Sequence, residues 1–495
     1  MKSYIDLIQQ TFEFPTMEFN VDNNELLFNN VPLMDIIKEH GTPLKITYLP
    51  KIGEHIENSR MFFRNAFKRY NYNGKYTYCY CTKSSHFSFV LEEALKQGVH
   101  LETSSSFDIP IIRELYRRGK IDKSTYILAN GFKRPLYTQY LSEIINEGFN
   151  CVPILDNLKE IEAYENCTAE TIKVGIRIAT DEEPNFAFYT SRLGIRYNDV
   201  QQLYKEKIEP NPKFQLKMLH FFINTGMKDS AYYWSELTRF MFKYCEMKKI
   251  CPELDSIDIG GGLPIQTSLY SSFDYQQMID EIVENIQWIC NKNNVAVPHI
   301  FTEFGSYTVG ESGAVIYKII DKKLQNDKEL WYMIDGSFIT HLPDSWGMNQ
   351  KYILLPVNNW DNPYQKVNLG GLTCDSQDFY NTEMHSSDLY LPVYLEDETQ
   401  YVGFFHTGAY QESLGGYGGI QHCLIPAPKH VLVDRDKDGK LTTKVFAREQ
   451  DSESMLRILG FRDESYVQPS ENEENENESQ SVPDEIFEDS VINKG

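Results

Sequence analysis

Eight short β-rich runs alternate with helical patterns between residues 76 and 305, and this alternation limits the possible folds more than any other feature of the chain. The segments between the runs repeat apolar residues every three or four positions, as on one face of a helix, and examples are residues 87–97, 109–118, 136–147 and 275–291. Parallel βα units produce this pattern. Eight of them predict an α/β fold with a closed (β/α)8 barrel of TIM type. The runs are residues 76–83, 100–105, 125–130, 151–156, 173–178, 215–224, 256–262 and 299–305.

The chain has 495 residues, which is too long for one ordinary core, so we expect a second domain beside a barrel at residues 61–328. Short β-rich runs at 330–334, 352–357, 389–394 and 430–433 predict a mostly β domain over residues 329–466. Residues 1–60 contain short apolar runs such as 44–48 and are expected to contribute to that β domain. Residues 467–495 are rich in Glu, Asn and Ser and are expected to form a disordered acidic tail.

The formal net charge is −23, of which −8 comes from residues 470–495 and −15 from the rest. A surface of this sign disfavours a nucleic-acid partner and attracts a small cationic substrate. The nine cysteines are scattered and include no C-x-x-C pair, so they indicate neither a disulfide framework nor a zinc ribbon, and a reducing cytoplasm is the expected location. No apolar run approaches the roughly 18 residues of a membrane helix, so no membrane association is expected.

Polar residues and glycines stand at the ends of the predicted strands, and in such barrels the catalytic groups lie at the carboxyl ends of the strands. These residues are Lys83, Ser105, Asn130, Asp156, Asn224, the glycines at 260–262 and Glu303. Polar residues that merely mark where each strand leaves the core would explain any one of them. They explain a lysine on the first strand and three consecutive glycines on the seventh less easily.

Three of these strand ends suit pyridoxal phosphate, which withdraws the electron pair left on Cα when an amino acid loses its carboxylate. Lys83 could form an imine with the cofactor, the backbone N–H groups near Gly261 and Gly262 could bind its phosphate, and Glu303 could keep its pyridine nitrogen protonated. Each has an ordinary alternative: a surface lysine, a tight turn and a capping glutamate. No metal site is predicted.

The chain resembles the fold type III, alanine-racemase-like decarboxylases over roughly residues 44–449. The motifs that carry this resemblance are Tyr80-Cys-Thr-Lys83, Leu101-Glu-Thr-Ser-Ser105, Asp258-Ile-Gly-Gly-Gly262, Glu303-Phe-Gly305, Gly371-Leu-Thr-Cys-Asp-Ser-Gln-Asp378 and Gly408-Ala-Tyr410. Three stretches look most like the biosynthetic arginine decarboxylases, namely residues 342–350, 372–376 and 408–415.

This resemblance implies roles for individual residues. Lys83 would hold the cofactor and Glu303 would pair with the pyridine nitrogen, while the other cofactor-binding residues would be Ser105, Phe222, Gly261, Gly262, Gly305 and Tyr410. Cys374 would protonate Cα, and a thiol with an unperturbed pKa of about 8.5 can do so at neutral pH. Asp344 and Asp375 would bind the cationic end of the substrate. In the family the cysteine and its neighbouring aspartate reach the other protomer's site, so the resemblance implies a homodimer with shared active sites.

Two positions depart from the family pattern. Phe222 stands where the family commonly has a histidine stacked on the cofactor ring, and Ser306 stands where it has an arginine after the glycine of the Glu303 motif. A phenylalanine can still stack on the ring. The missing arginine removes a phosphate contact, so either another donor replaces it or the cofactor binds less tightly.

Residues 434–442 copy the start of a calcium-binding EF-hand loop, but the twelfth position is Val445 rather than a glutamate. The flanks, 430–433 and 441–446, have the composition of strands. A β-hairpin that turns at residues 437–440 is therefore expected, without calcium.

The pattern as a whole predicts conversion of L-arginine to agmatine and carbon dioxide, a step of polyamine biosynthesis. A decarboxylase of ornithine, lysine or diaminopimelate is the nearest alternative, because Asp344 and Asp375 could also accept an amine. An inactive, partner-binding homologue remains open because of Phe222 and Ser306. Racemisation fits less well, since the second domain carries the Cys374-Asp375 pair.

Overall fold

The computed structural model describes residues 15–180, 191–224, 226–228, 230–269, 273–380, 389–395 and 397–462. The chain divides into two compact units, Met1–Glu449 and Gln450–Gly495. The second unit contains α14 (Ser452–Ile458). The tail expected at residues 467–495 lies outside the described residues.

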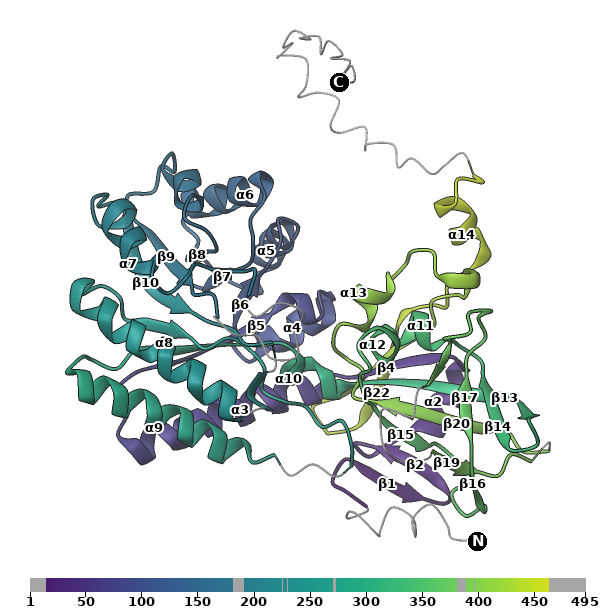
Figure 1. The fold of residues 1–495 in the computed structure, drawn as a ribbon. Helices are drawn as coiled ribbons and strands as arrows, with labels where there is room; N and C mark the ends of the chain where they lie inside the picture. The colour runs from purple at the N-terminus through teal and green to yellow at the C-terminus, as the bar shows by residue number, and fades with distance from the viewer. Residues whose placement is uncertain are drawn as a thin grey trace, which may run out of the picture. The chain divides into compact units, whose positions relative to one another are not determined.

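Eight parallel strands close into a barrel, as the sequence predicted (Figure 1). The last strand pairs with the first, with Ile300 opposite Tyr76. Each predicted run contributes one strand, and the polar positions noted above lie within four residues of the strand ends. The strands are β5 (Tyr76–Cys81), β6 (His100–Thr103), β7 (Ile127–Ala129), β8 (Cys151–Leu155), β9 (Ile172–Arg177), β10 (Phe214–His220), β11 (Ser256–Asp258) and β12 (His299–Phe304).

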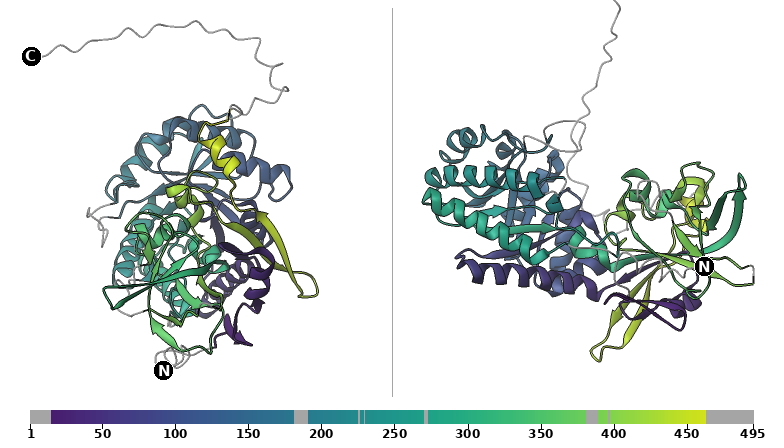
Figure 2. Two further views of the ribbon diagram at one scale, coloured as in Figure 1. Left: turned by 90° about the vertical axis from the view of Figure 1, so that its right-hand side faces the viewer. Right: turned by 60° about the horizontal axis from the view of Figure 1, so that its bottom comes forward.

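Helices surround this barrel, and their apolar faces pack against the outer faces of the strands (Figures 1 and 2). The first of them, α3, lies beside the last, α9, where Phe62 and Tyr275 stack with ring centroids 5.9 Å apart. The helices are α3 (Pro50–Tyr70), α4 (Ser88–Lys96), α5 (Asp108–Arg117), α6 (Pro135–Asn146), α7 (Val200–Leu203), α8 (Ser230–Ile250) and α9 (Tyr275–Asn293).

A small apolar cluster fills the barrel interior and contains Cys79, Leu128, Val152, Ile154, Met218 and Phe301. The backbone of Gly175 on β9 lies so close to this cluster that a Cβ at this position would be 2.5 Å from Cδ1 of Ile154. The interior is therefore packed, and only the mouth of the barrel is available for chemistry.

A nine-stranded sheet forms the second domain, and β4 from the N-terminal region lies in it between β13 and β21, as expected. The predicted runs at 330–334, 352–357 and 430–433 are strands of this sheet. Its strands are β4 (Leu44–Tyr48), β13 (Gly313–Gln325), β14 (Glu329–Ile334), β15 (Ile353–Pro356), β17 (Asn368–Gly370), β18 (Phe379–Tyr380), β20 (Gln400–Phe405), β21 (Lys429–Arg435) and β22 (Leu441–Ala447).

Smaller elements complete this domain. Two further sheets are formed by β1 (Phe19–Asp22), β2 (Glu25–Phe28) and β3 (Val31–Pro32), and by β16 (Tyr364–Lys366) with β19 (Tyr390–Pro392), which contains half of the run predicted at 389–394. Five short helices connect the strands: α2 (Leu33–His40), α10 (Ser306–Val309), α11 (Phe338–His341), α12 (Pro343–Gly347) and α13 (Gln411–Gly415).

The change from one sheet to the other comes earlier than the boundary expected at residue 328. β13 follows the barrel after α10 and one 3-10 turn, and it already belongs to the second sheet. Residues 320–325 of this strand are exposed and mostly polar, so the sequence of this half of the strand does not predict a place in a buried sheet. At the N-terminal end, α3 packs on the barrel and begins at Pro50. The barrel domain therefore starts before residue 61, where it was expected to start.

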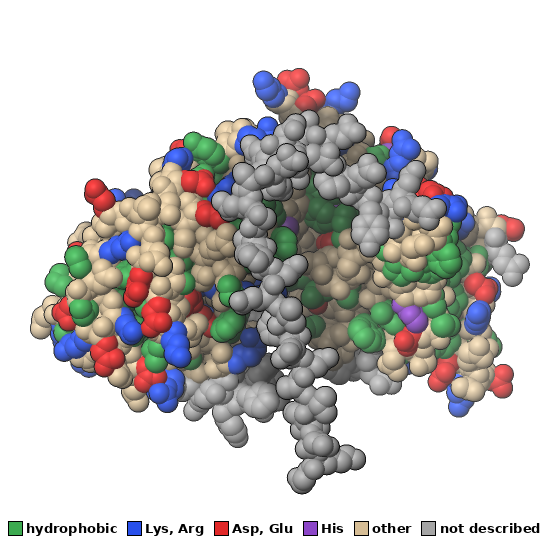
Figure 3. All heavy atoms as spheres, turned by 90° about the horizontal axis from the view of Figure 1, so that it is seen from above, with side chains coloured by type: hydrophobic (Ala, Val, Ile, Leu, Met, Phe, Trp, Pro, Cys, Tyr) green, Lys and Arg blue, Asp and Glu red, His purple; other side chains and the backbone are tan. Residues whose placement is uncertain are grey.

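Residues 429–447 form the expected hairpin rather than an EF-hand. β21 and β22 pair antiparallel, and Gly439 in the turn has a φ of 78°. No helix in the described part of the chain is long and apolar enough to cross a membrane. The face in Figure 3 carries acidic and basic side chains interspersed with one another.

Candidate active site

Lys83 follows β5 directly, on a 3-10 turn formed by Thr82–Ser84. Its Nζ donates to Sγ of Cys81 at 2.8 Å and lies 3.1 Å from Oε2 of Glu102, which is fully buried on β6. The Cys81 thiol also donates to the same Glu102 oxygen, at 2.7 Å. The Lys83 side chain remains 44% exposed, so its amine is anchored by a carboxylate yet accessible at the barrel mouth.

The surroundings of Lys83 favour its protonated form. Burial works to lower the pKa of Lys83, but Cys81, Glu102 and Glu303 together raise that pKa well above its ordinary value. An amine that attacks a carbonyl must be neutral, so in this site a carbonyl compound has to capture the small fraction of neutral amine.

Glu303 on β12 is buried and is held by Asn130, which follows β7. Nδ2 of Asn130 donates to Oε1 of Glu303 at 3.1 Å and lies 3.1 Å from Nε2 of His220. Nδ1 of His220 lies 3.3 Å from Oδ2 of Asp258, and Oδ1 of Asp258 accepts from the N–H of Gly260 at 2.8 Å. The ends of three neighbouring strands, β10, β11 and β12, and of β7 across the barrel therefore supply one connected polar cluster.

Burial dominates the protonation of this cluster. It raises the pKa of Glu303 well above its usual range, with a further contribution from the nearby carboxylate of Asp258, and raises the pKa of Asp258 to about 6. It lowers the pKa of His220 to about 4, so the imidazole is neutral. The cluster thus holds two carboxyl groups, and the nearby Lys83 amine only partly offsets the effect of burial on their pKa values.

Three buried atoms here make no hydrogen bond of good geometry: Oε1 of Glu102, and Nδ1 of His220 and Oδ2 of Asp258, which face each other at 3.3 Å. Buried polar atoms are normally hydrogen-bonded, so such a group near the barrel mouth indicates a place for a ligand. A protonated pyridine nitrogen would supply both a further positive charge and a donor.

The glycines after β11 bring backbone close to neighbouring strands. Gly260 and Gly262 have φ values of 69° and 101°, and a Cβ at Gly261 would lie 2.7 Å from the carbonyl oxygen of Glu303. A Cβ at Gly305 would meet Cβ of Ser84 at 3.0 Å. Side chains are excluded from this part of the mouth, which leaves backbone N–H groups for a phosphate.

Tyr410 comes from the β domain and reaches the Lys83 turn. Its N–H donates to the carbonyl oxygen of Ser84 at 2.8 Å, and it has a φ of 69°, which is unusual for a residue other than glycine. Burial raises the pKa of Tyr410 to about 12, while a hydrogen bond with the Ser306 side chain opposes that rise. Ser306, which stands where the family has an arginine, therefore contacts Tyr410.

Asp344 is tied to the helix that begins after Tyr410. Nε2 of Gln411 donates to Oδ2 of Asp344 at 2.8 Å, and the Asp344 N–H lies 3.3 Å from Oε1 of Gln411. Burial raises the pKa of Asp344. The sequence singled out Asp344 and Tyr410 separately, and the amide of Gln411 joins them.

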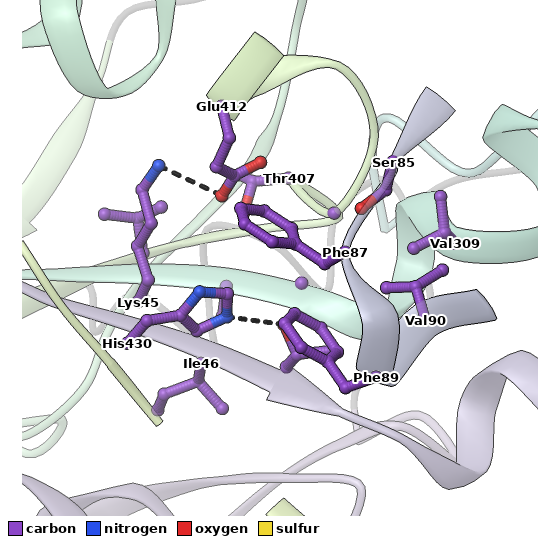
Figure 4. A pocket seen from close by; sticks show the side chains of 15 residues that line it. Lys45, Ile46, Ser85, Phe87, Phe89, Val90, Val309, Thr407, Glu412 and His430 are labelled. Carbon is purple, nitrogen blue, oxygen red and sulfur yellow. Dashed lines mark hydrogen bonds and ion pairs between the residues drawn. The ribbon is translucent and has the colours of Figure 1, made fainter. Parts of the chain in front are cut away.

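A cavity behind α13 contains a second charged pair (Figure 4). Nζ of Lys45 on β4 donates to Oε1 of Glu412 at 3.0 Å, and Oγ1 of Thr47 lies 2.8 Å from Nε2 of His430. The rings of Phe87 and Phe89 line the same cavity. These contacts fix α13, and with it Tyr410, to the sheet.

Cys374 and Asp375 lie elsewhere, on the loop between β17 and β18. The described contacts of the Cys374 side chain are with Cys423, and Asp375 accepts from the N–H of Gln377 at 2.8 Å. Buried Asp378 organises the loop by accepting from the N–H groups of Phe338 and Thr373. None of the described contacts joins this loop to Lys83 of the same chain.

The two remaining predicted residues take different positions. Oγ of Ser105 accepts from the N–H of Phe107 at 3.1 Å, so this hydroxyl shapes the start of α5. Phe222 is half-buried after β10 and lies against the glycine loop, where a Cβ at Gly260 would be 3.3 Å from its ring.

Sequence reasoning assigned no role to Glu102, His220, Asp258 or Gln411. Glu102 and Asp258 lie inside the motifs quoted above. A charged residue within a β-rich run is the sequence feature that could have identified them as site residues. His220 and Gln411 gave no signal, because their partners come from distant parts of the chain.

A lysine, buried carboxyl groups and a glycine loop at the mouth of a closed barrel are the parts that a pyridoxal-phosphate enzyme requires, and the orphaned atoms and open backbone described above fit that cofactor. The chain belongs to the pyridoxal-dependent decarboxylase family, whose pyridoxal binding domain matches residues 54–310. It is therefore an amino-acid decarboxylase, and its cofactor is pyridoxal phosphate, as predicted from the sequence.

Similarity to individual proteins extends over most of the chain. It is 22% identical to the biosynthetic arginine decarboxylase of Prochlorococcus marinus, over 89% of this chain and 86% of that protein. The crystal structure of the biosynthetic arginine decarboxylase from Campylobacter jejuni matches with a TM-score of 0.77 and 19% identity, covering 93% of this chain and 91% of the other. Diaminopimelate decarboxylase from M. jannaschii, in a complex with L-lysine, matches with a TM-score of 0.72 and 16% identity, covering 88% and 96%.

Proposed function

We propose that this enzyme converts L-arginine to agmatine and carbon dioxide. The observation that carries this proposal is the Lys83–Glu102 pair beside the buried Glu303 cluster, at the mouth of a barrel whose family decarboxylates amino acids. The choice of arginine is supported by the relatives named above and by the three stretches that resemble arginine decarboxylases.

The cofactor is held by residues from both domains. Lys83 would hold its aldehyde carbon and Glu303 would pair with the pyridine nitrogen, while Asn130 and His220 hold Glu303 in place. Phe222 would pack on the ring, while the phosphate would be bound by Gly261, Gly262, Gly305, Tyr410 and the loop that contains Ser105. When bound, pyridoxal phosphate supplies the electron sink for the pair left on Cα.

Cys374 supplies the proton that Cα needs after carbon dioxide leaves. Its side chain is exposed and has no described contact with Lys83 of its own chain. In the family that the chain resembles this cysteine reaches the other protomer's site, so we assign it to the site of a second copy. The active unit is therefore a homodimer in which each site combines Lys83 of one protomer with the Cys374 loop of the other.

Asp344 and Asp375 bind the far end of the substrate. A carboxylate can accept two parallel hydrogen bonds from a guanidinium group, whereas an ammonium group offers a single point of charge. Decarboxylation of ornithine, lysine or diaminopimelate is the second candidate, because the same carboxylates accept an amine. The nine thiols suit a reducing location such as the cytoplasm.

Release of carbon dioxide from L-arginine, ornithine, lysine and diaminopimelate by the protein loaded with pyridoxal phosphate tests this proposal. We expect release from arginine, none from Lys83→Ala, and wild-type release from Lys120→Ala, a surface control. Preference for another amino acid would overturn the substrate. A protein that gains no visible absorbance band with pyridoxal phosphate would be an inactive homologue instead.

A further inference from the structure

The thiol of Cys374 lies against a second thiol, that of Cys423. The two Sγ atoms are 3.3 Å apart, and the N–H of Cys374 points to Sγ of Cys423 at 3.4 Å. These are the two exposed cysteines of the chain, and the other seven are buried. The pair is thus the place where two thiols are both adjacent and accessible.

The backbone conformation on the Cys423 side is unusual. Cys423 lies on a short 3-10 turn, His422–Leu424, and both Cys423 and Leu424 have left-handed φ values, 55° and 54°. Residues other than glycine adopt such values at a cost in free energy, and strain of this kind often accompanies function. Here the turn presents a thiol to the loop that carries the proposed proton donor.

We propose that Cys374 and Cys423 form a reversible disulfide that switches the decarboxylase off, an inference that rests on the proposed role of Cys374. Each thiol loses one proton, one S–S bond forms, and two electrons pass to an oxidant such as a low-molecular-weight disulfide, which is reduced to two thiols. In the disulfide, Cys374 has no proton to give to Cα.

The geometry permits this bond with small movements. A disulfide has an S–S length of about 2.05 Å, so the two sulfur atoms need to approach by roughly 1.3 Å. Both cysteines lie in connecting segments, and Asp378 anchors the neighbouring Thr373 rather than Cys374 itself. An exposed disulfide in such segments is readily reduced, which suits a switch in a reducing compartment better than a structural bond.

Zinc is the alternative occupant, because a ring nitrogen of His422 lies within 4.8 Å of both sulfur atoms. Two thiolates on one tetrahedral zinc lie roughly 3.8 Å apart, given Zn–S bonds of about 2.3 Å. The observed 3.3 Å is shorter and favours direct contact between the sulfur atoms.

The test uses the reduced, cofactor-loaded enzyme and glutathione disulfide as the oxidant. We expect a loss of at least 10-fold in carbon dioxide release from arginine, recovery with dithiothreitol, and a peptide that links residues 374 and 423. Cys423→Ser should keep the reduced activity and resist the loss. Cys290→Ala, at a buried cysteine of α9, should behave like the wild type.

Two results would overturn the inference: equal sensitivity of Cys423→Ser and wild type, or no linked peptide. Inactivation by added zinc that a chelator reverses, together with indifference to glutathione disulfide, would assign the cluster to a metal instead. The linked peptide forms independently of turnover. A protein that is inactive even when reduced therefore contradicts the proposed function, whereas a missing link contradicts the disulfide.

Discussion

Asn130 donates a hydrogen bond from Nδ2 to Oε1 of Glu303 at 3.1 Å, and 173 residues of sequence separate the two. The same amide nitrogen faces the unprotonated Nε2 of His220, so one side chain orients both the carboxylate and the imidazole under the cofactor site. Because the cluster is buried, the loss of this amide leaves acceptors without a donor.

We therefore expect Asn130→Ala to weaken pyridoxal phosphate binding and to lower kcat/KM by about 10-fold or more, since Glu303 would be ionised when it pairs with the pyridine nitrogen, and a hydrogen bond to a charged group contributes about 1.5–3 kcal/mol. Cofactor titration followed by absorbance measures this effect. Asn150→Ala is the control, because Asn150 bonds to the carbonyl oxygen of Ser124, outside this cluster. Equal cofactor affinity of the Asn130 variant and the wild type would contradict the role of this amide.

Glu102 should set the pH at which Lys83 captures the cofactor. Glu102 is one of the groups that raise the pKa of Lys83, so Glu102→Gln should lower that pKa and increase the neutral amine at a given pH. The apoenzyme variant should therefore capture pyridoxal phosphate at lower pH than the wild type. Rates of band formation across a pH series measure this shift, and Glu92→Gln, near Arg118 and Lys120, serves as the control. If Glu102→Gln captured pyridoxal phosphate at the same pH as the wild type, or only at higher pH, this role of Glu102 would be wrong.

The strand ends were predictable from the sequence because a polar residue or glycine terminates seven of the eight runs, and barrel closure then brings these ends together. The cluster of His220, Asp258 and Glu303 was not predictable in detail. A carboxyl group inside a strand becomes buried beside a second one only when β10, β11 and β12 pair in register. The place of β13 in the second sheet was likewise not predictable, because half of this strand is exposed and mostly polar.

His406 should make stability fall as the pH rises. Its Nδ1 faces the carbonyl oxygen of Gln266 at 2.7 Å and its Nε2 faces Oε2 of Glu18 at 3.0 Å, so both ring nitrogens donate. Burial works to lower the pKa of His406, but Glu18 and Glu311 raise that pKa above its ordinary 6.5. The contribution of His406 to folding stability is fully present below pH 6.5, the pKa of histidine in the unfolded chain. It is lost as the pH rises through the higher pKa of His406 in the folded protein.

Urea unfolding midpoints between pH 6 and 9 measure this effect. The wild-type midpoint should decline over this range, and the decline should be smaller in His406→Gln. Glu18 has a lowered pKa, so its own contribution is constant over the same range. His422→Gln, at an exposed residue, should retain the wild-type slope, and an identical slope in His406→Gln would refute the assignment.

The Lys45–Glu412 pair should stabilise the fold and support Tyr410. Both side chains are largely buried, at 10% and 15% exposure, so Lys45→Met leaves a buried carboxylate without its cation and should cost about 3 kcal/mol of unfolding free energy. The double variant Lys45→Met/Glu412→Leu should recover much of that loss. Lys38→Met, at an exposed pair with Glu25, should have little effect. A stable single variant would show that the pair contributes little.

Shared active sites predict complementation between two inactive variants. Lys83→Ala and Cys374→Ala homodimers each lack one component of both sites. When they are mixed under conditions that allow subunits to exchange, about half of the dimers are mixed, and one of the two sites in each mixed dimer has both residues. Activity should therefore return to about 25% of the wild-type value, and this would place Cys374 in the partner's site. If Cys374 served Lys83 of its own chain, every mixed dimer would again have no complete site, and the mixture would stay inactive.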